Sequence, residues 1–252
     1  MRLLLDVGNT RTKIGHLKEG EIKKTWERQT RAGETADELW NSVRSLTGAD
    51  PEKTSLSAVS VVPSLSTALQ AASVKYLSGR IFLLEAPWDE AEVKIGTQEP
   101  ARVGADRVAA AEAAYRLYGG GIVVDFGTAT TVEVISGEGA YLGGVILPGV
   151  DAAAESLTQA AASLPVFSPQ RPASLETGGT EAALQSGLYF GTAGAVERIV
   201  RGVRKKFGLP QSLPVVITGG RGEEFEPIID EVIELEPDLV LKGLNFIVEN
   251  AR

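Results

Sequence analysis

The chain carries one strand-and-turn pattern twice, and this internal repeat restricts its fold more than any other feature. At an offset of 119 residues, identical residues align as five pairs: Asp6 and Asp125, Gly8 and Gly127, Thr12 and Thr131, Glu19 and Glu138, and Gly20 and Gly139. Each copy reads as an apolar run, an acid, a glycine turn with hydroxyls, an alternating run and a Glu-Gly turn, which predicts a β-hairpin. The period is too long for a solenoid, so we expect two homologous halves that face one another.

Apolar spacing and turn residues predict the other elements. In the first half, strands are expected at 2–6, 11–18, 21–27, 55–62 and 80–85, and helices at 34–46, 64–77 and 104–118. In the second half, strands are expected at 122–126, 130–135, 141–147, 214–220 and 232–235, and helices after Gly149, at about 179–206, after 220 and at 239–250. The glycine run 119–121 separates the halves, so we expect two α/β domains, 1–118 and 119–252.

Composition excludes several classes of function. Without cysteine, the chain has no disulfide, thiol nucleophile or thiolate metal site. The net charge of −8 and the scattered basic residues argue against nucleic acid as a partner, and the densest basic cluster, residues 201–208, is predicted to be a solvated helix end. No apolar stretch is long enough for a membrane span, and an acid comes too early for a signal peptide, so a cytoplasmic protein without a membrane partner is expected.

The two predicted turns offer the same chemical groups. Each has backbone N–H groups, several hydroxyls and one carboxylate at a strand end, Asp6 in the first copy and Asp125 in the second. Glycine turns surround a polyphosphate with backbone donors, and a divalent cation would relieve its repulsion by the two acids. A single acid of this kind is usually only a turn cap. Two in register favour a nucleotide site with Mg²⁺, held directly or through water.

Five motifs occur in an order and at spacings that resemble the type III pantothenate kinases: "DVGNT" (6–10), "GADR" (104–107), "DFGTATT" (125–131), "YLGGVILPG" (141–149) and "ITGG" (217–220). The resemblance extends from residue 1 to about 248 and includes "SVVPSL" (60–65), "TEAALQSGLYFG" (180–191) and "PDLVLKGL" (237–244). That family belongs to the superfamily of acetate and sugar kinases, Hsp70 and actin. The resemblance therefore implies two duplicated ribonuclease H-like (actin-like ATPase) lobes with a cleft between them.

The resemblance also implies an activity and its residues: ATP-dependent phosphorylation of the 4′-hydroxyl of pantothenate, the first step of coenzyme A synthesis. By this resemblance the first ATP-binding turn comprises Asp6, Val7, Gly8, Asn9, Thr10, Arg11, Thr12 and Lys13. Thr128 is expected to contact ATP, and Asp125 to coordinate a monovalent cation (K⁺ or NH₄⁺). The pantothenate site is expected at Gly104, Ala105, Asp106 and Arg107 with a contact from Thr180, and the family implies a homodimer, with the helix at 179–206 as a candidate interface.

The chemistry of Asp106 suits the general base that the family places there. In the first turn of a helix, exposed N–H groups and the helix dipole favour the ionised carboxylate. A weak but charged base is adequate where it need only orient a hydroxyl, because phosphoryl transfer depends mainly on positioning and charge neutralisation. Arg107 is a candidate partner for the substrate carboxylate. Thr180 is either a helix N-cap or a substrate contact, and Gly219 and Gly220 either admit adenosine or simply form a turn.

One position departs from the family pattern. Many members have a tyrosine lining the pantothenate pocket shortly before the "GADR" motif, where this chain has Thr97. The departure indicates altered substrate affinity, a shifted loop, or a paralogue that no longer uses pantothenate. Two alternative functions therefore stay open: a non-catalytic accessory or regulatory protein of the same fold, and a small-molecule kinase with another acceptor. The acids at 6, 106 and 125 argue against the first, and the "GADR" motif against the second.

Overall fold

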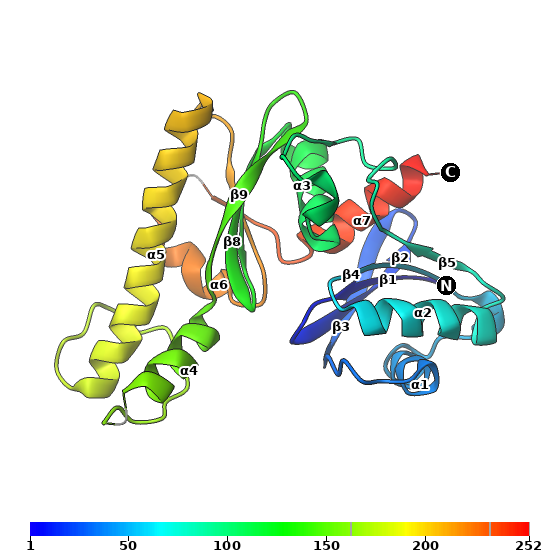
Figure 1. Cartoon of the computed structure of the whole chain (residues 1–252), viewed down its shortest axis with the longest axis horizontal. Coiled ribbons are helices and arrows are strands. Elements are labelled where there is room, and N and C mark those ends of the chain that lie inside the picture. Colours follow the sequence, from blue (N-terminus) through cyan, green and yellow to red (C-terminus); the bar gives the residue numbers. More distant parts are fainter. Residues whose placement is uncertain (162, 232, 252) are drawn as a thin grey trace. The chain divides into compact units, whose positions relative to one another are not determined.

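The computed structural model describes residues 1–161, 163–231 and 233–251, and it divides into two compact units (Figure 1). The first unit comprises Met1–Arg116 together with the C-terminal segment from Leu239, and the second comprises Leu117–Asp238. The predicted domains differ from these units mainly at the C-terminus, because the last helix packs with the first unit. Within the described residues, no helix combines the length and apolar character needed to cross a bilayer.

The first unit is a five-stranded mixed sheet with the strand order β3-β2-β1-β4-β5. Its strands are β1 (Arg2–Val7), β2 (Arg11–Lys18), β3 (Glu21–Gln29), β4 (Ser55–Ser60) and β5 (Ile81–Leu83). The short β6 (Lys94–Ile95) also belongs to this unit but is not a strand of this sheet. Its helices are α1 (Ala36–Thr47), α2 (Pro63–Tyr76), α3 (Ala105–Tyr118, whose last two residues belong to the second unit) and α7 (Leu239–Asn250), with 3-10 turns η1 (Pro51–Lys53) and η2 (Pro100–Arg102). The strands β1, β2 and β3 are antiparallel neighbours, whereas β4 and β5 continue the sheet in parallel.

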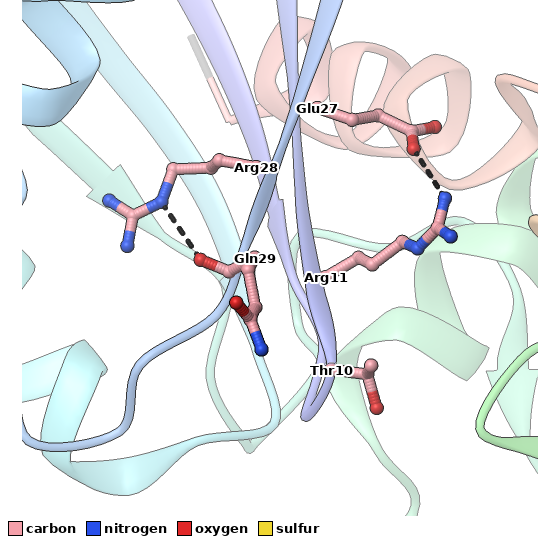
Figure 2. A pocket seen from close by; sticks show the side chains of 5 residues that line it. All are labelled: Thr10, Arg11, Glu27, Arg28 and Gln29. Carbon is pink, nitrogen blue, oxygen red and sulfur yellow. Dashed lines mark hydrogen bonds and ion pairs between the residues drawn. The ribbon is translucent and has the colours of Figure 1, made fainter.

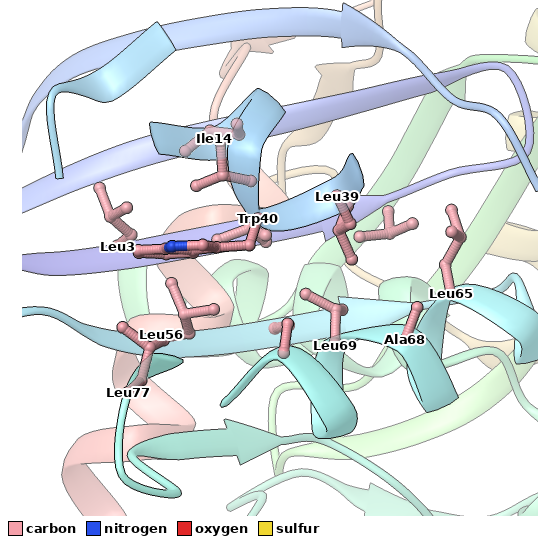
Figure 3. Close-up of a cluster of buried hydrophobic side chains, with 14 of the residues drawn as sticks. Leu3, Ile14, Leu39, Trp40, Leu56, Leu65, Ala68, Leu69 and Leu77 are labelled. Atoms are coloured by element: carbon pink, nitrogen blue, oxygen red, sulfur yellow. The ribbon is translucent and has the colours of Figure 1, made fainter. Parts of the chain in front are cut away.

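One face of this sheet forms a core with α1 and α2 (Figure 3). Leu3, Leu5 and Ile14 point to that face and pack in a buried cluster with Trp40 of α1 and Leu69 of α2. Alternation along β1 sends Leu4 and Asp6 to the other face. Helix α1 begins at a capping box, in which Thr35 and Glu38 satisfy each other's backbone N–H groups, and ends at a left-handed Gly48.

Helix α7 packs on β1 and β4, and it approaches α3 at backbone distance. A Cβ added at Gly243 of α7 would lie 1.7 Å from the carbonyl oxygen of Ala109, so only glycine fits there. On β2, a Cβ at Gly15 would lie 3.0 Å from Leu241, which places α7 on the sheet face opposite the α1 and α2 core. The middle of the alanine-rich α3, residues 108–114, is buried throughout, as a helical segment without a polar face must be.

Within the second unit the strand order is β9-β8-β7-β10-β11, so these five strands repeat the topology of the first sheet. Its strands are β7 (Gly121–Phe126), β8 (Ala129–Ile135), β9 (Ala140–Pro148), β10 (Val215–Thr218) and β11 (Ile233–Leu235). Its helices are α4 (Val150–Ala160), α5 (Thr180–Phe207) and α6 (Gly222–Phe225), followed by η3 (Glu226–Ile228). Again three antiparallel strands are extended by two parallel ones. The core lies between the sheet and α4, α5 and α6, around Phe126, Tyr189 and Phe225.

The duplication is confirmed, but the two turns differ by one residue. In the first copy, Val7 of β1 pairs with Thr12 of β2 and four residues lie between them, whereas in the second copy Phe126 of β7 pairs with Thr130 of β8 and three residues lie between them. Thr12 therefore corresponds in space to Thr130 rather than to the identical Thr131. The longer second turn of the later copy, which ends at the left-handed Gly139, restores the offset of 119. Because the shorter first turn and the longer second turn of the later copy compensate for each other, an ungapped comparison of the two sequences detects neither.

Most predicted elements are confirmed with shifted ends. The strand predicted at 80–85 is reduced to Ile81–Leu83, and that predicted at 214–220 to Val215–Thr218. Val232, at the start of the last predicted strand, lies outside the described residues, and the strand is observed at Ile233–Leu235. The prediction that residues 201–208 form a solvated helix end is wrong for Arg204. That side chain is buried and donates to the carbonyl oxygens of Pro210 and Leu213 at 2.8 and 2.9 Å.

Candidate active site

The first predicted phosphate turn lies between β1 and β2. Gly8 donates its N–H to the carbonyl of Arg11 at 3.0 Å, which closes the turn and leaves Asn9 and Thr10 exposed. Asp6 and Lys13 stand opposite each other in the strand register, both partly buried. They point to the sheet face opposite the α1 and α2 core. The turn therefore joins exposed backbone with one acid and one base from adjacent strands.

A polar pocket of about 420 Å³ borders this turn (Figure 2). It is lined by Thr10, Arg11, Glu27, Arg28 and Gln29, from the start of β2 and the end of β3. Arg11 extends to Glu27, with Nη1 and Oε2 3.1 Å apart, and this pair is largely exposed. Arg28 donates to the carbonyl of Gln29 at 3.3 Å and also pairs with Glu34 in a buried contact. The pocket supplies cationic side chains beside the turn, although neither Asp6 nor Lys13 lines it.

The second predicted phosphate turn, between β7 and β8, is surrounded by glycines from distant parts of the chain. Asp125 pairs in register with Thr131 of β8 and with Thr218 of β10. A Cβ at Gly219 would lie 2.3 Å from Oδ1 of Asp125, which leaves no room for a side chain. Gly219 also has a φ of +90°, which favours glycine for a second reason. A Cβ at Gly149 would lie 2.4 Å from the carbonyl oxygen of Thr128. We call the turn with Gly149 and Gly219 the glycine cradle.

The "GADR" segment lies at the start of α3. Asp106 occupies the first helical turn, and its Oδ1 accepts the N–H of Arg107 at 2.8 Å. A Cβ at Gly104 would lie 2.5 Å from the same oxygen and 3.7 Å from Val61, which itself donates its N–H to Val7 at 3.1 Å. Asp106 therefore lies at the end of the first unit where β1 and β4 finish. The structure brings Asp106 and the first turn to one edge of one sheet.

The segment before α3 is held to that helix by a buried carboxylate. Glu112 is fully buried, and its Oε2 accepts the backbone N–H groups of Glu92 and Val93 at 2.8 and 3.0 Å. Its other oxygen has no hydrogen-bond partner within the described part of the chain. Burial raises the pKa of Glu112, although the two N–H donors and Arg116 oppose the shift. Glu112 was not singled out from the sequence, because nothing near it in the chain marks an acid inside an alanine-rich helix as buried.

The two remaining predicted residues are threonines. Thr180 is the first residue of α5 and is exposed, and the cap position belongs to Gly179, so the prediction that Thr180 serves as the N-cap is wrong. Thr97 follows β6, and its hydroxyl is buried without a hydrogen-bond partner among the described residues. A buried hydroxyl without a partner costs free energy unless a ligand or water satisfies it. The predicted substrate contact of Thr180 stays a prediction.

The predicted site residues fall into two groups, one in each unit. Asp6, Lys13 and Asp106 belong to the first unit, and Asp125 and Thr128 to the second. Within the described residues, no three His, Cys, Asp or Glu side chains gather in a way that could hold a metal ion. A cation at Asp6 or Asp125 would therefore take most of its ligands from phosphates, backbone carbonyls and water, which is how Mg²⁺ is usually held beside nucleotides.

Comparison with known proteins identifies the family. The family model described as type III pantothenate kinase matches residues 2–202. Curated type III pantothenate kinases from Agathobacter rectalis and Salinispora arenicola are 35% and 36% identical over 253 and 251 residues. These alignments cover 98% and 99% of this chain and 96% and 99% of the relatives.

Solved structures show the fold independently. A Campylobacter jejuni protein described as a Baf family transcriptional activator matches with a TM-score of 0.65 at 20% identity, covering 99% of this chain and 98% of its own. The activator of 2-hydroxyisocaproyl-CoA dehydratase from Clostridium difficile, with bound ADPNP, matches with a TM-score of 0.53 at 14% identity, covering 99% and 95%. Such likenesses establish an actin-like ATPase fold and no activity. The family model and the curated relatives show that the chain belongs to the type III pantothenate kinase family.

Proposed function

We propose that this protein transfers the γ-phosphate of ATP to the 4′-hydroxyl of pantothenate, the first step of coenzyme A biosynthesis. The observation that carries the proposal is the near-full-length match to curated type III pantothenate kinases. The motif residues support it, because Asp6, Asp106 and Asp125 all lie at strand or helix ends. A fold-level likeness alone would not identify a reaction.

In this proposal the two turns bind the nucleotide. Residues 6–13 hold ATP phosphates through backbone N–H groups and Lys13, and Thr128 contacts the nucleotide from the second turn. The glycine cradle supports this role, because Gly149 and Gly219 let neighbouring segments pack directly on the turn that would present backbone donors to a polyphosphate. ADPNP bound to the dehydratase activator is consistent with nucleotide binding by this fold.

The acceptor is assigned to the start of α3. Gly104 to Arg107 would hold pantothenate, with Asp106 orienting the hydroxyl and accepting its proton as the phosphoryl group transfers. Arg107 would pair with the substrate carboxylate, and Thr180 would add a contact. The bond between Asp106 and the N–H of Arg107 supports an ionised, oriented carboxylate. The Thr97 hydroxyl is a further candidate for this pocket, because a bound polar group would satisfy it.

Cations complete the proposed site. Mg²⁺ would travel with ATP and lie near Asp6, directly or through water, and K⁺ or NH₄⁺ would lie at Asp125. The residues fit these ions, because the Asp125 carboxylate lies among the strand-end backbone of the glycine cradle and offers only hard oxygen ligands. When bound, the cations neutralise phosphate charge. The chain's own groups position the two substrates.

The proposal includes a homodimer in the cytoplasm, with α5 as the candidate interface and neither nucleic acid nor membrane as a partner. Helix α5 spans 28 residues and buries only part of its surface in the second unit. Light scattering at working concentration should therefore give twice the 26.6 kDa chain mass. A monomer mass would contradict the dimer without affecting the kinase assignment.

A coupled assay with Mg-ATP, K⁺ and a panel of acceptors tests the function. We expect turnover on pantothenate in the wild type, its loss in Asp106→Asn, and wild-type rates in Asp230→Asn, which alters an exposed acid outside the motifs. Circular dichroism should show that Asp106→Asn stays folded. Turnover on another acceptor only would replace pantothenate in the proposal, and no turnover on any acceptor would favour the accessory role.

A further inference from the structure

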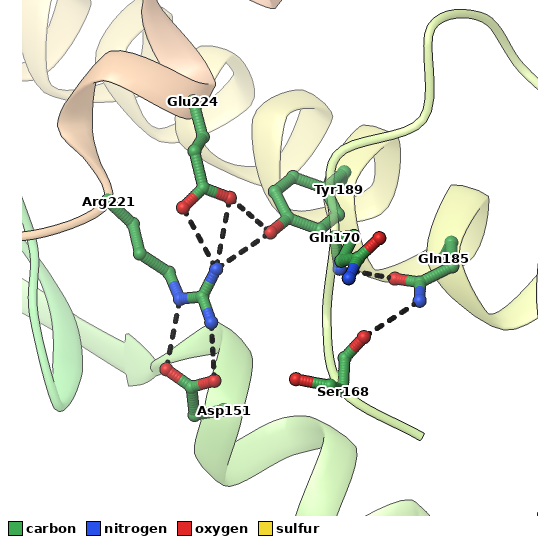
Figure 4. A network of polar contacts seen from close by, with 7 residues as sticks. All are labelled: Asp151, Ser168, Gln170, Gln185, Tyr189, Arg221 and Glu224. Atoms are coloured by element: carbon green, nitrogen blue, oxygen red, sulfur yellow. Dashed lines mark hydrogen bonds and ion pairs between the residues drawn. The ribbon is translucent and has the colours of Figure 1, made fainter.

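Arg221 directly follows the Gly219–Gly220 loop, and its guanidinium group donates hydrogen bonds to three side chains (Figure 4). Arg221 donates from Nε and Nη2 to the two carboxylate oxygens of Asp151, at 2.9 and 2.6 Å. Its Nη1 donates to the hydroxyl of Tyr189 at 2.8 Å and to both oxygens of Glu224 at 3.0 Å. This Arg221 cluster joins the first turn of α4, the middle of α5 and the short α6.

The cluster is continuous with the glycine cradle. The backbone N–H of Arg221 donates to the carbonyl of Phe126, the last residue of β7, at 3.2 Å. Asp151 comes two residues after Gly149, which lies against the carbonyl oxygens of Gly127 and Thr128. One side chain therefore holds both segments that close on the second turn: the loop containing Gly219 and the start of α4.

Burial and charge show a preformed arrangement. The phenol of Tyr189 donates to Glu224, and its ring stacks on Phe225, which in turn stacks on Phe126 with ring centroids 4.1 Å apart. Burial and the bond to Glu224 raise the pKa of Tyr189, so the phenol stays neutral. Hydrogen bonding to Asp151 raises the pKa of Arg221, so the guanidinium stays charged. Asp151 is 68% exposed, so its ion pair contributes little energy, and its two-point geometry is the informative feature.

We propose that Arg221 is a positioning residue for the nucleotide: it holds the Gly219–Gly220 loop and the start of α4 against the second turn, and so sets the affinity for Mg-ATP without affecting the acceptor. The proposal rests on the proposed function of this site. Gly219 has a φ of +90°, and because glycine adopts many backbone conformations readily, neighbouring groups are needed to hold the loop in this one. Arginine suits this task and lysine does not, because only a planar fork can bond Asp151 at two points while reaching Tyr189 and Glu224.

The test measures nucleotide binding apart from turnover. Calorimetric titration of the wild type with the Mg²⁺ complex of a non-hydrolysable ATP analogue gives the reference Kd. We expect Arg221→Lys to raise that Kd about tenfold, the effect of losing roughly 1.4 kcal/mol. The KM for pantothenate should stay within about twofold, within the scatter of a remote substitution. Arg44→Lys, which alters an exposed arginine of α1 in the first unit, is the matched control and should leave both constants unchanged.

A second variant keeps the test decisive if Arg221→Lys does not fold. Asp151→Asn alters the exposed carboxylate that accepts two hydrogen bonds from Arg221. It should raise the nucleotide Kd by a smaller factor than Arg221→Lys does. The double variant should lose less than the two single losses combined, because both act through one contact. An unchanged nucleotide Kd in these variants, or a parallel rise of Kd and pantothenate KM, would overturn the positioning role. If the wild type binds the nucleotide but does not use pantothenate, a weakened Kd in Arg221→Lys still supports this inference while the proposed function fails.

Discussion

The two turns of the duplicated hairpin each join a pair of antiparallel strands but have different surroundings. The first turn, at residues 8–10, leaves Asn9 and Thr10 exposed beside an open polar pocket. The second, at Gly127 and Thr128, is enclosed by Gly149 and Gly219 at distances that admit no Cβ. The residues that enclose it come from outside the hairpin. Duplication therefore supplied two equivalent strand ends, and later segments of the second unit made one of them a rigid cradle.

A second difference concerns the buried hydroxyls at equivalent positions of β2 and β8. Thr12 bonds the hydroxyl of Thr30 at 2.9 Å, whereas Thr130 is fully buried with no hydrogen-bond partner among the described residues. The buried threonine hydroxyl should therefore stabilise the first unit, where it has a partner, and destabilise the second, where it has none among the described residues. Four predictions, taken from the largest expected effect to the smallest, break or sharpen such comparisons.

The largest effect is expected from adding a methyl group at the cradle. Gly219→Ala places a Cβ against Asp125 in a left-handed conformation, and we expect it to lower the free energy of unfolding by about 3 kcal/mol. Gly8→Ala in the first turn meets only the carbonyl of Arg11, at 3.0 Å, and should cost less than about 1 kcal/mol. Urea unfolding measures both. Equal losses would show that the two turns are equally constrained.

Substitutions of the two strand-end acids, Asp6 and Asp125, should affect the binding of different cations. We expect Asp125→Asn to raise the K⁺ concentration needed for half-maximal activity about tenfold, as the loss of roughly 1.4 kcal/mol would. Asp6→Asn should instead weaken binding of the Mg²⁺ nucleotide complex and leave the K⁺ requirement unchanged. Initial rates in mixed sodium and potassium buffers provide the measurement. Equal wild-type rates in sodium-only and potassium buffers would argue against any monovalent cation at Asp125.

The hydroxyl pair gives a smaller effect with a predicted change of sign. Thr12→Val leaves the Thr30 hydroxyl without its partner and should destabilise the protein by about 1 kcal/mol. Thr130→Val removes a buried hydroxyl that has no partner among the described residues, and it should be neutral or stabilising. Thermal unfolding of the two variants side by side checks the sign. A loss of stability in Thr130→Val would reveal a partner that its hydroxyl satisfies.

The smallest effect is a change in pH dependence, and it compares the helices α3 and α7. Helix α3 buries the acid Glu112, whereas α7 buries the neutral Asn245. Because burial raises the pKa of Glu112, the folded protein holds this proton more tightly than the unfolded chain. This tighter proton binding stabilises the fold fully below about pH 4.5, the ordinary pKa of a glutamate, and the stabilisation is lost as pH rises through the raised pKa.

Glu112→Gln should remove the part of the pH dependence of the free energy of unfolding that comes from Glu112. The variant should keep its fold, because its side-chain oxygen can still accept the N–H groups of Glu92 and Val93. Denaturant unfolding of the variant and the wild type across this pH range measures the difference. Glu52→Gln, which neutralises an exposed acid, is the control and should keep the wild-type slope. If Glu112→Gln also keeps it, the buried acid does not titrate in this range.

The sequence alone determined the local elements and the duplication. The repeated Asp-x-Gly turns, the apolar spacing within residues 34–46 and the glycine run that follows residue 118 are local signals, and the structure confirms the elements they predict. Family motifs led to the type III pantothenate kinases, which the comparisons confirm. These features are readable because each depends on residues a few positions apart.

Only the tertiary structure decided which residues of different segments meet. The one-residue difference between the turns, the packing of α7 on the first unit, the burial of Glu112 and the Arg221 cluster all arise from such contacts. Arg221 and Asp151 are 70 positions apart, and no local pattern marks them as partners. Periodicity reports how a segment divides between core and solvent. The choice among possible partners is made by packing, which excludes a Cβ at Gly219 and Gly243 but not at the exposed glycines of α5.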